Sequence, residues 1–287
     1  MNIAICTRAT MYNHQRLYVN QIIYNYWIRM QAGIVEKILR SGKPVNLTGD
    51  GQFDSPGFSA RFLFYTMIDS ATKLVVDFYM AEKTMVEYSG KMEPFAAKLL
   101  LGRLVRKKIG VRVLTTDRSS SLKKLLRDVN AELRRRKMAP IKHSYDIWHF
   151  VKAVIKDCLL AAKLKKCQTL GSWIKSLRNM LWYCFSACKG NPLLLREMIL
   201  SIPKHISGVH EFPENKLFKR CLHGELGDDR SKPWLKPGSL SMKKLNKAIR
   251  GKKDCRLKDL DMMTEFQHTS VNENINARHG FKKSWFF

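Results

Sequence analysis

The feature that most constrains the fold is a change in hydrophobic periodicity between residues 45 and 146. Three early segments alternate apolar with polar side chains or are rich in aromatic and β-branched residues, which is typical of strands: 45–51, 61–68 and 74–80. The pattern then alternates between the two periodicities, with helices expected over 92–108 and 119–136 and strands over 111–117 and 140–146. The chain is therefore expected to form an α/β domain built on a sheet.

The order of these segments narrows the expected topology. Asp69–Lys73 form a five-residue turn between two strand-like segments, which predicts an antiparallel hairpin. Three antiparallel strands followed by strand–helix alternation is the order of an RNase H-like core, in which the first and fourth strands are neighbours. We therefore expect an RNase H-like mixed sheet with helices.

The flanking segments are helical in pattern. Residues 14–40 carry one apolar face, and the helix is expected to end at Gly42 and Pro44: the face comprises Ile23, Trp27, Met30, Ile34 and Ile38. Residues 147–262 are mostly helical and rich in Lys and Cys, which predicts a large α-helical insertion. The expected organisation is an N-terminal helical segment (1–44), the first part of the core (45–150), the insertion (151–262) and the C-terminal part of the core (263–287).

Charge and cysteine content restrict the partners and the compartment. Lys plus Arg (52) exceeds Asp plus Glu (24), so the 287-residue chain carries a net charge of +28. Such a basic chain usually has a polyanionic partner, and nucleic acid is favoured over an anionic membrane surface. Seven cysteines, an odd number, are typical of reduced thiols or metal ligands in a cytosolic or nuclear protein. Neither a signal peptide nor a transmembrane helix is expected.

Three carboxylates are candidates for a metal site. Asp50 is expected at the end of the first strand, Asp117 at the end of the fourth, and Glu273 at the start of the last helical segment. In an RNase H-like sheet the first and fourth strands are neighbours, so Asp50 and Asp117 are expected side by side. Like charges at that distance repel unless a divalent cation lies between them. Two Mg²⁺ (or Mn²⁺) ions held in this way catalyse phosphodiester chemistry.

Each carboxylate also has a structural interpretation. Asp50 lies between two glycines and is compatible with a turn, with Asp54 as the alternative ligand. Asp117 is suited to capping the helix that follows it. Residues 270–273 (SVNE) form a capping box in which Glu273 bonds back to the cap residue, and Glu265 competes with it as the third ligand.

Several motifs resemble those of one family. Residues 49–60 (GDGQFDSPGFSA) are similar to the GDGxxDSPGxSA signature of a metazoan transposase-like family, Thr116–Arg118 to its second acidic motif, and 146–150 (DIWHF) to its D-x-W-H-F element. Residues 235–239 and 264–269 resemble its later segments. The relatives are DDE cut-and-paste transposases of the Kolobok and Mutator-like type, and the resemblance covers most of residues 10–275.

The resemblance implies an RNase H-like fold with an α-helical insertion and an Asp50–Asp117–Glu273 triad. It also implies Mg²⁺-dependent DNA cleavage and strand transfer. Asp146 and His149 are expected to support the metal ligands; the alternative is a helix cap and a core histidine. Because many relatives carry an N-terminal zinc-binding DNA-recognition domain that is not recognisable here, the chain is expected to be a truncated or transposon-derived copy.

A second, zinc-binding cluster is also considered. Cys184 and Cys188 lie one helical turn apart, and four more soft ligands follow: His205, His210, Cys221 and His223. Zinc is usually held by about four nitrogen or sulfur ligands, and this set contains enough of them, although the spacing fits no standard finger. The alternative is buried, inert cysteines beside the tryptophans of the same helix.

Basic runs support a nucleic-acid partner. They are expected mostly on polar helix faces: 103–108, 123–127, 134–137 and 163–166. A single run is usually only solvated, but several together favour phosphate contacts, and residues 134–137 (RRRK) suggest import into the nucleus. The expected function is a DNA-cleaving and strand-transfer domain. The alternatives are a non-catalytic, transposon-derived DNA-binding protein and an unrelated RNase H-like nuclease, and a homo-oligomer stays open.

Overall fold

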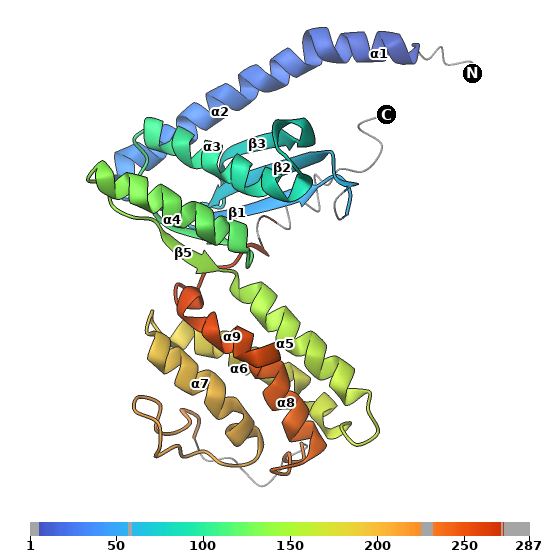
Figure 1. Ribbon diagram of the computed structural model, residues 1–287, viewed down its shortest axis with the longest axis vertical. Helices are drawn as coiled ribbons and strands as arrows, with labels where there is room; N and C mark the ends of the chain where they lie inside the picture. Colours follow the sequence, from blue (N-terminus) through green and yellow to red (C-terminus); the bar gives the residue numbers. More distant parts are fainter. Residues whose placement is uncertain (1–5, 57–58, 225–231, 271, 273–287) are drawn as a thin grey trace. The chain divides into compact units, whose positions relative to one another are not determined.

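The computed structural model describes residues 6–56, 59–224, 232–270 and 272, and it shows a mixed α/β protein (Figure 1). Within these residues one sheet is formed by β1 (Val45–Phe53), β2 (Phe62–Asp69), β3 (Val75–Glu82), β4 (Val111–Thr116) and β5 (Lys142–Tyr145). The strand order is β3-β2-β1-β4-β5. The prediction that the first and fourth strands are neighbours is therefore confirmed.

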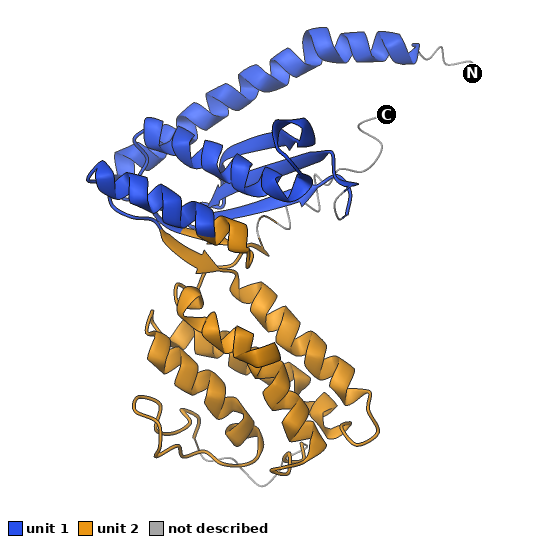
Figure 2. Cartoon of the chain, in the orientation of Figure 1, with its two compact units in different colours: residues 1–113, 124–141, 280–287 blue, residues 114–123, 142–279 orange. Residues whose placement is uncertain are grey.

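The chain divides into two compact units (Figure 2). One boundary between them falls inside β4, after residue 113. The first includes residues 1–113 and 124–141, and the second includes residues 114–123 and 142–279. The helices are α1 (Arg8–His14), a π-helical turn (Gln15–Val19), α2 (Asn20–Ser41), α3 (Met92–Arg106), α4 (Ser120–Arg135), α5 (Ile147–Ala162), α6 (Thr169–Ala187), α7 (Pro192–Ile206), α8 (Leu240–Arg250) and α9 (Cys255–Lys258).

The first strand is longer than the sequence suggests. β1 continues to Phe53, so Asp50 lies inside the strand, opposite Thr66 of β2, and the prediction that Asp50 ends the strand is wrong. The flanking glycines make room for a neighbouring side chain, because a Cβ at Gly49 would lie 2.4 Å from the Oη atom of the buried Tyr65. Glycine inside a strand commonly marks such a close approach, which the local sequence does not distinguish from a turn.

The predicted hairpin is confirmed. β1 pairs antiparallel with β2, and β2 pairs antiparallel with β3. The turn between β2 and β3 closes through Lys73, whose φ is +62°, and through the Asp69 carboxylate, which accepts from the backbone N–H and the hydroxyl of Thr72. These local contacts explain why a five-residue turn is readable from the sequence.

The N-terminal helices pack over only part of their length. In α2, Ile34 is buried, Gln31 Nε2 donates to the carbonyl oxygen of Val76 at 3.0 Å, and the Trp27 ring lies 4.8 Å from that of Phe78. Ile23, by contrast, is 60% exposed, so the expected apolar face is buried only where it meets β3. Among the described helices, none is both long enough and apolar enough to cross a membrane.

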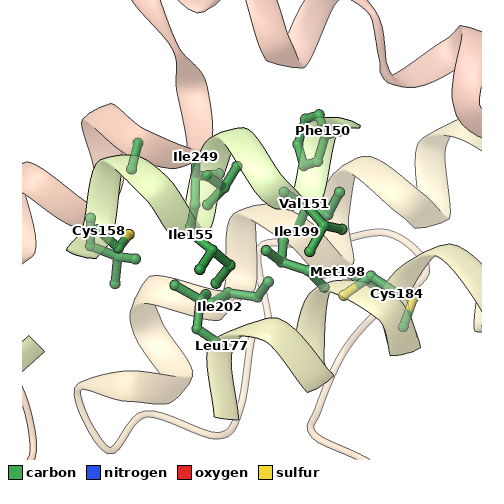
Figure 3. Packing of buried hydrophobic residues seen from close by; sticks show 14 of the residues in the cluster. Phe150, Val151, Ile155, Cys158, Leu177, Cys184, Met198, Ile199, Ile202 and Ile249 are labelled. Atoms are coloured by element: carbon green, nitrogen blue, oxygen red, sulfur yellow. The ribbon is translucent and has the colours of Figure 1, made fainter. Parts of the chain in front are cut away.

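The second unit has a helical core of its own. Side chains from α5, α6, α7 and α8 interdigitate there, as Figure 3 shows for Phe150, Ile155, Leu177, Ile199 and Ile249. The helical pattern of the Lys- and Cys-rich stretch is thus confirmed in its described residues. This core holds the helix α5 that begins at the site described next.

Candidate functional site

Three residues from the sequence motifs come together in the second unit. Asp117 follows the last residue of β4, Asp146 precedes α5, and His149 lies in the first turn of α5. Each offers a potential ligand atom, and these atoms all lie within 4.8 Å of one another. His149 Nδ1 lies 2.5 Å from Asp146 Oδ2 and 3.0 Å from Asp117 Oδ1. The backbone N–H of Asp146 also donates to the carbonyl oxygen of Thr116 at 3.0 Å, which fixes the start of α5 beside the end of β4.

Asp146 is a buried helix cap. Its Oδ1 accepts from the backbone N–H of Trp148 at 2.9 Å, in the N-cap position where a short acidic side chain satisfies an unpaired donor of the first turn. Its Oδ2 contacts His149, three residues further on and therefore on the same helix face. The structure thus confirms the helix-cap interpretation of Asp146, while the His149 side chain is 40% exposed and is not a core histidine. A supporting role for Asp146 and His149 beside a metal stays a prediction.

A distant threonine completes the surroundings of Asp146. Thr269 Oγ1 donates to Asp146 Oδ2 at 2.7 Å, and the Thr269 backbone N–H lies 3.3 Å from Asp146 Oδ1. The same segment is attached at two further points: Lys142 Nζ lies 2.7 Å from Glu265 Oε1, and Ser144 Oγ donates to the carbonyl oxygen of Met262. The stretch before residue 270 therefore packs along β5 and the start of α5.

Asp146 and His149 stabilise each other's charged forms. Burial acts to raise the pKa of Asp146, but hydrogen bonds from His149, Thr269 and the Trp148 backbone outweigh it, and the net pKa is lowered. The neighbouring carboxylates, Asp117 first and then Asp146, raise the pKa of His149 to about 10, against the opposing effect of burial. The raised pKa favours the imidazolium form of His149 at neutral pH.

Asp117 has the chemistry of a cation ligand. Its Oδ1 is buried and lies 3.0 Å from His149 Nδ1, an ion-pair contact without the geometry of a hydrogen bond. The side chain as a whole is 42% exposed, so the carboxylate is accessible from outside. A carboxylate suits hard cations such as Mg²⁺ and Mn²⁺. Asp117 thus fits the metal that the family resemblance implies, whereas Asp146 and His149 fit a positioning role.

The remaining carboxylates have different surroundings. Asp50 Oδ1 accepts from the backbone N–H of Gly51 at 2.8 Å within β1. Asp54 accepts from the backbone N–H of Arg61 and so braces the loop between β1 and β2. Glu265 Oε1 pairs with Lys142 Nζ at 2.7 Å, and its role as the alternative third ligand stays a prediction. Glu273 lies outside the described residues.

The cysteine–histidine prediction resolves into two groups. Cys184 and Cys188 are buried, and burial raises the pKa of the Cys184 thiol to about 12; the Cys188 thiol donates to the Phe185 carbonyl oxygen. The structure therefore favours the alternative of inert core thiols for these two. The other four candidates do converge, with ligand atoms within 4.8 Å of one another: His205, His210, Cys221 and His223.

Thr269 is the site residue that sequence reasoning did not single out. It lies within the 264–269 motif, but nothing local indicates that its hydroxyl meets a carboxylate 123 positions earlier.

Compared with protein-family models, with curated proteins and with solved structures, the chain gives no match.

Proposed function

We propose that the chain is an RNase H-like, transposase-derived domain that cleaves and joins DNA, with Asp50, Asp117 and Glu273 as ligands of divalent cations. The observation that carries this proposal is the Asp117 carboxylate, which directly follows a central strand, is accessible, and has a buried oxygen with no aligned donor. The strand order β3-β2-β1-β4-β5 supports it further, because β1 carries Asp50 and β4 leads to Asp117.

Two neighbouring residues hold the Asp117 carboxylate in a position to bind a divalent cation. His149 holds Asp117 Oδ1 at ion-pair distance, and Asp146 fixes the His149 ring from the other side. The positive charge of His149 neutralises part of the negative charge of Asp117 and Asp146, which would otherwise oppose the approach of a phosphate. When bound, divalent cations activate a water or a 3′-hydroxyl and stabilise the leaving oxygen. Asp146 and His149 are positioning residues in this scheme.

Exposed basic side chains are suited to the DNA backbone. On α4 and just beyond it, the exposed cations are Lys123, Lys124, Arg127, Arg134, Arg135, Arg136 and Lys137. The net charge of +28 indicates that many such contacts are available. Each Lys or Arg that neutralises a phosphate releases a counterion, so DNA affinity should fall steeply with salt.

Nicking of supercoiled plasmid by the purified full chain tests the proposal. Mg²⁺- or Mn²⁺-dependent nicking is expected, and Asp117→Asn should lower it by orders of magnitude because the cation ligand is lost. Asp128→Asn is the matched control, because it removes the same charge from an exposed aspartate (61%) of α4. Duplex DNA binding without metal should hold or strengthen in Asp117→Asn, since a negative charge is removed.

Two outcomes would contradict the catalytic proposal. Nicking that survives Asp117→Asn would exclude this carboxylate as an essential ligand. A wild-type chain that binds DNA in a salt-dependent manner but does not nick it in either metal would support the second candidate, a non-catalytic DNA-binding protein. The exposed basic residues of α4 favour that candidate equally, so only the cleavage assay separates the two.

A further inference from the structure

We infer that His205, His210, Cys221 and His223 form a structural zinc site that fixes the segment following α7. The four side chains come from a helix end and from the irregular stretch beyond it, and their candidate ligand atoms all lie within 4.8 Å of one another. Three imidazoles and one thiol are ligands that zinc binds well and that Mg²⁺ and Ca²⁺ do not. None of these four ligands is among the residues around Asp117.

The distances match tetrahedral coordination. His205 Nδ1 lies 3.2 Å from Cys221 Sγ, and His223 Nε2 lies 3.2 Å from His210 Nδ1. With the usual zinc–nitrogen and zinc–sulfur bond lengths, a tetrahedral site separates nitrogen pairs by roughly 3.3 Å and nitrogen–sulfur pairs by roughly 3.6 Å. These two pairs are therefore already near the separations of a tetrahedral site, and all the other pairs lie within 4.8 Å.

One histidine is already held in the tautomer that a metal requires. His223 Nδ1 lies 2.7 Å from the carbonyl oxygen of Gly224, and only a protonated nitrogen can donate there. Nε2 of the neutral ring then carries the lone pair, and this is the atom that faces His210. Metal-ligating histidines characteristically donate their other ring N–H to a carbonyl or carboxylate, which fixes the ring and strengthens the ligand.

A short antiparallel pairing brings His210 beside Cys221. The backbone N–H of Cys221 donates to the His210 carbonyl oxygen at 2.9 Å, and the backbone N–H of Phe212 donates to the Lys219 carbonyl oxygen at 2.7 Å. An isolated bridge joins Glu211 and Arg220 between them. Two ligands that are eleven positions apart in sequence are thereby fixed across a hairpin.

Helix α7 anchors the tip of this hairpin. The Glu197 carboxylate accepts from the backbone N–H groups of Lys216, Leu217 and Phe218 at 2.8–2.9 Å. His205 lies near the C-terminal end of the same helix, and Gly208, with φ +88°, reverses the chain toward His210. The hairpin is thus held to α7 at its tip by Glu197, and the zinc ion holds it at its open end.

The number of ligands indicates a structural rather than a catalytic role. Four protein ligands close a tetrahedral site, whereas catalytic zinc sites keep one position for water or substrate. Hydrogen bonds alone explain two of the contacts, since each 3.2 Å distance accommodates one shared proton. A metal-free hydrogen-bonded cluster is therefore the competing explanation that an experiment must exclude.

Metal analysis and cobalt substitution of the purified full chain test the site. About one equivalent of tightly bound zinc is expected by elemental analysis. Co²⁺ added to chelator-treated protein should give the visible bands of tetrahedral cobalt and a near-ultraviolet thiolate charge-transfer band. Cys221→Ser should remove the charge-transfer band, and His210→Ala should weaken metal affinity by tenfold or more, as loss of even a supporting group costs about 10–100-fold.

Cys255→Ser is the matched control, because Cys255 is a partly buried free thiol like Cys221 but is not in the cluster. It should retain both the zinc and the cobalt spectrum. Substoichiometric zinc together with no tetrahedral cobalt spectrum in the wild-type chain would overturn the inference in favour of the hydrogen-bonded cluster. Retention of the charge-transfer band in Cys221→Ser would also overturn it, and if that variant fails to fold, the wild-type titration still decides.

Discussion

Replacing Asp146 by alanine tests whether the start of α5 is the point at which distant segments are held together. The variant loses the helix cap to Trp148, which is worth about 1 kcal/mol. It also loses the Thr269 hydroxyl as donor to a charged group, worth about 1.5–3 kcal/mol. The His149 pair adds no more than about 1 kcal/mol, because the imidazole is 40% exposed and partly screened. Together these losses predict a destabilisation of about 4 kcal/mol.

Urea unfolding followed by circular dichroism measures this difference. Asp157→Ala is the matched control, because Asp157 is also on α5 but its side chain is 46% exposed and forms an ion pair with Arg256, so less than about 1 kcal/mol is expected. A double-mutant cycle with Thr269→Val isolates the long-range hydrogen bond, for which a coupling energy of about 1.5 kcal/mol or more is expected.

Two results would contradict a stabilising role for Asp146 at this junction. If Asp146→Ala costs no more than Asp157→Ala, the carboxylate does not stabilise the junction. If the coupling with Thr269→Val is zero within error, Thr269 and Asp146 act independently, and the stretch before residue 270 is held by other contacts.

Three further predictions concern pH and packing. Burial lowers the pKa of His143 to about 4, so the folded state is not penalised by this residue above about pH 6.5 and loses stability as the pH falls toward 4. His143→Gln should remove about 3 kcal/mol of this pH dependence of the free energy of unfolding, measured by urea unfolding at several pH values. An unchanged pH dependence would contradict a pKa near 4. His149 has the opposite sign: its raised pKa of about 10 makes its contribution complete below pH 6.5 and lost as the pH rises through 10, and the ring protons followed by NMR should titrate in that alkaline range rather than near 6.5. Gly49→Ala should destabilise the chain by about 2 kcal/mol or more in thermal or urea unfolding, because its Cβ would overlap the hydroxyl of the buried Tyr65, whereas Gly33→Ala, with open space around it, should not.

The sequence alone determined the features that depend on neighbouring residues. Strand and helix periodicity located the hairpin, the helices and the order of the strands, since burial of one face recurs every two or 3.6 residues. The helix cap at Asp146, offered as an alternative from the sequence, follows from its position before an apolar helical run. The position of Asp117 at the end of its strand was likewise readable, because the apolar alternation stops there.

The contacts between distant segments could not be predicted from local patterns. Gly49 and Gly51 are in a strand rather than a turn because Tyr65, from the next strand, covers them. Thr269 reaches Asp146 across 123 positions, and the hairpin after α7 selects His205 and Cys221 for one cluster. Cys184 and Cys188 have the more regular spacing, yet they lie in the helical core. Local patterns record which face of an element is apolar; they do not record which partner that face will meet, because that choice is made by packing among elements far apart in the chain.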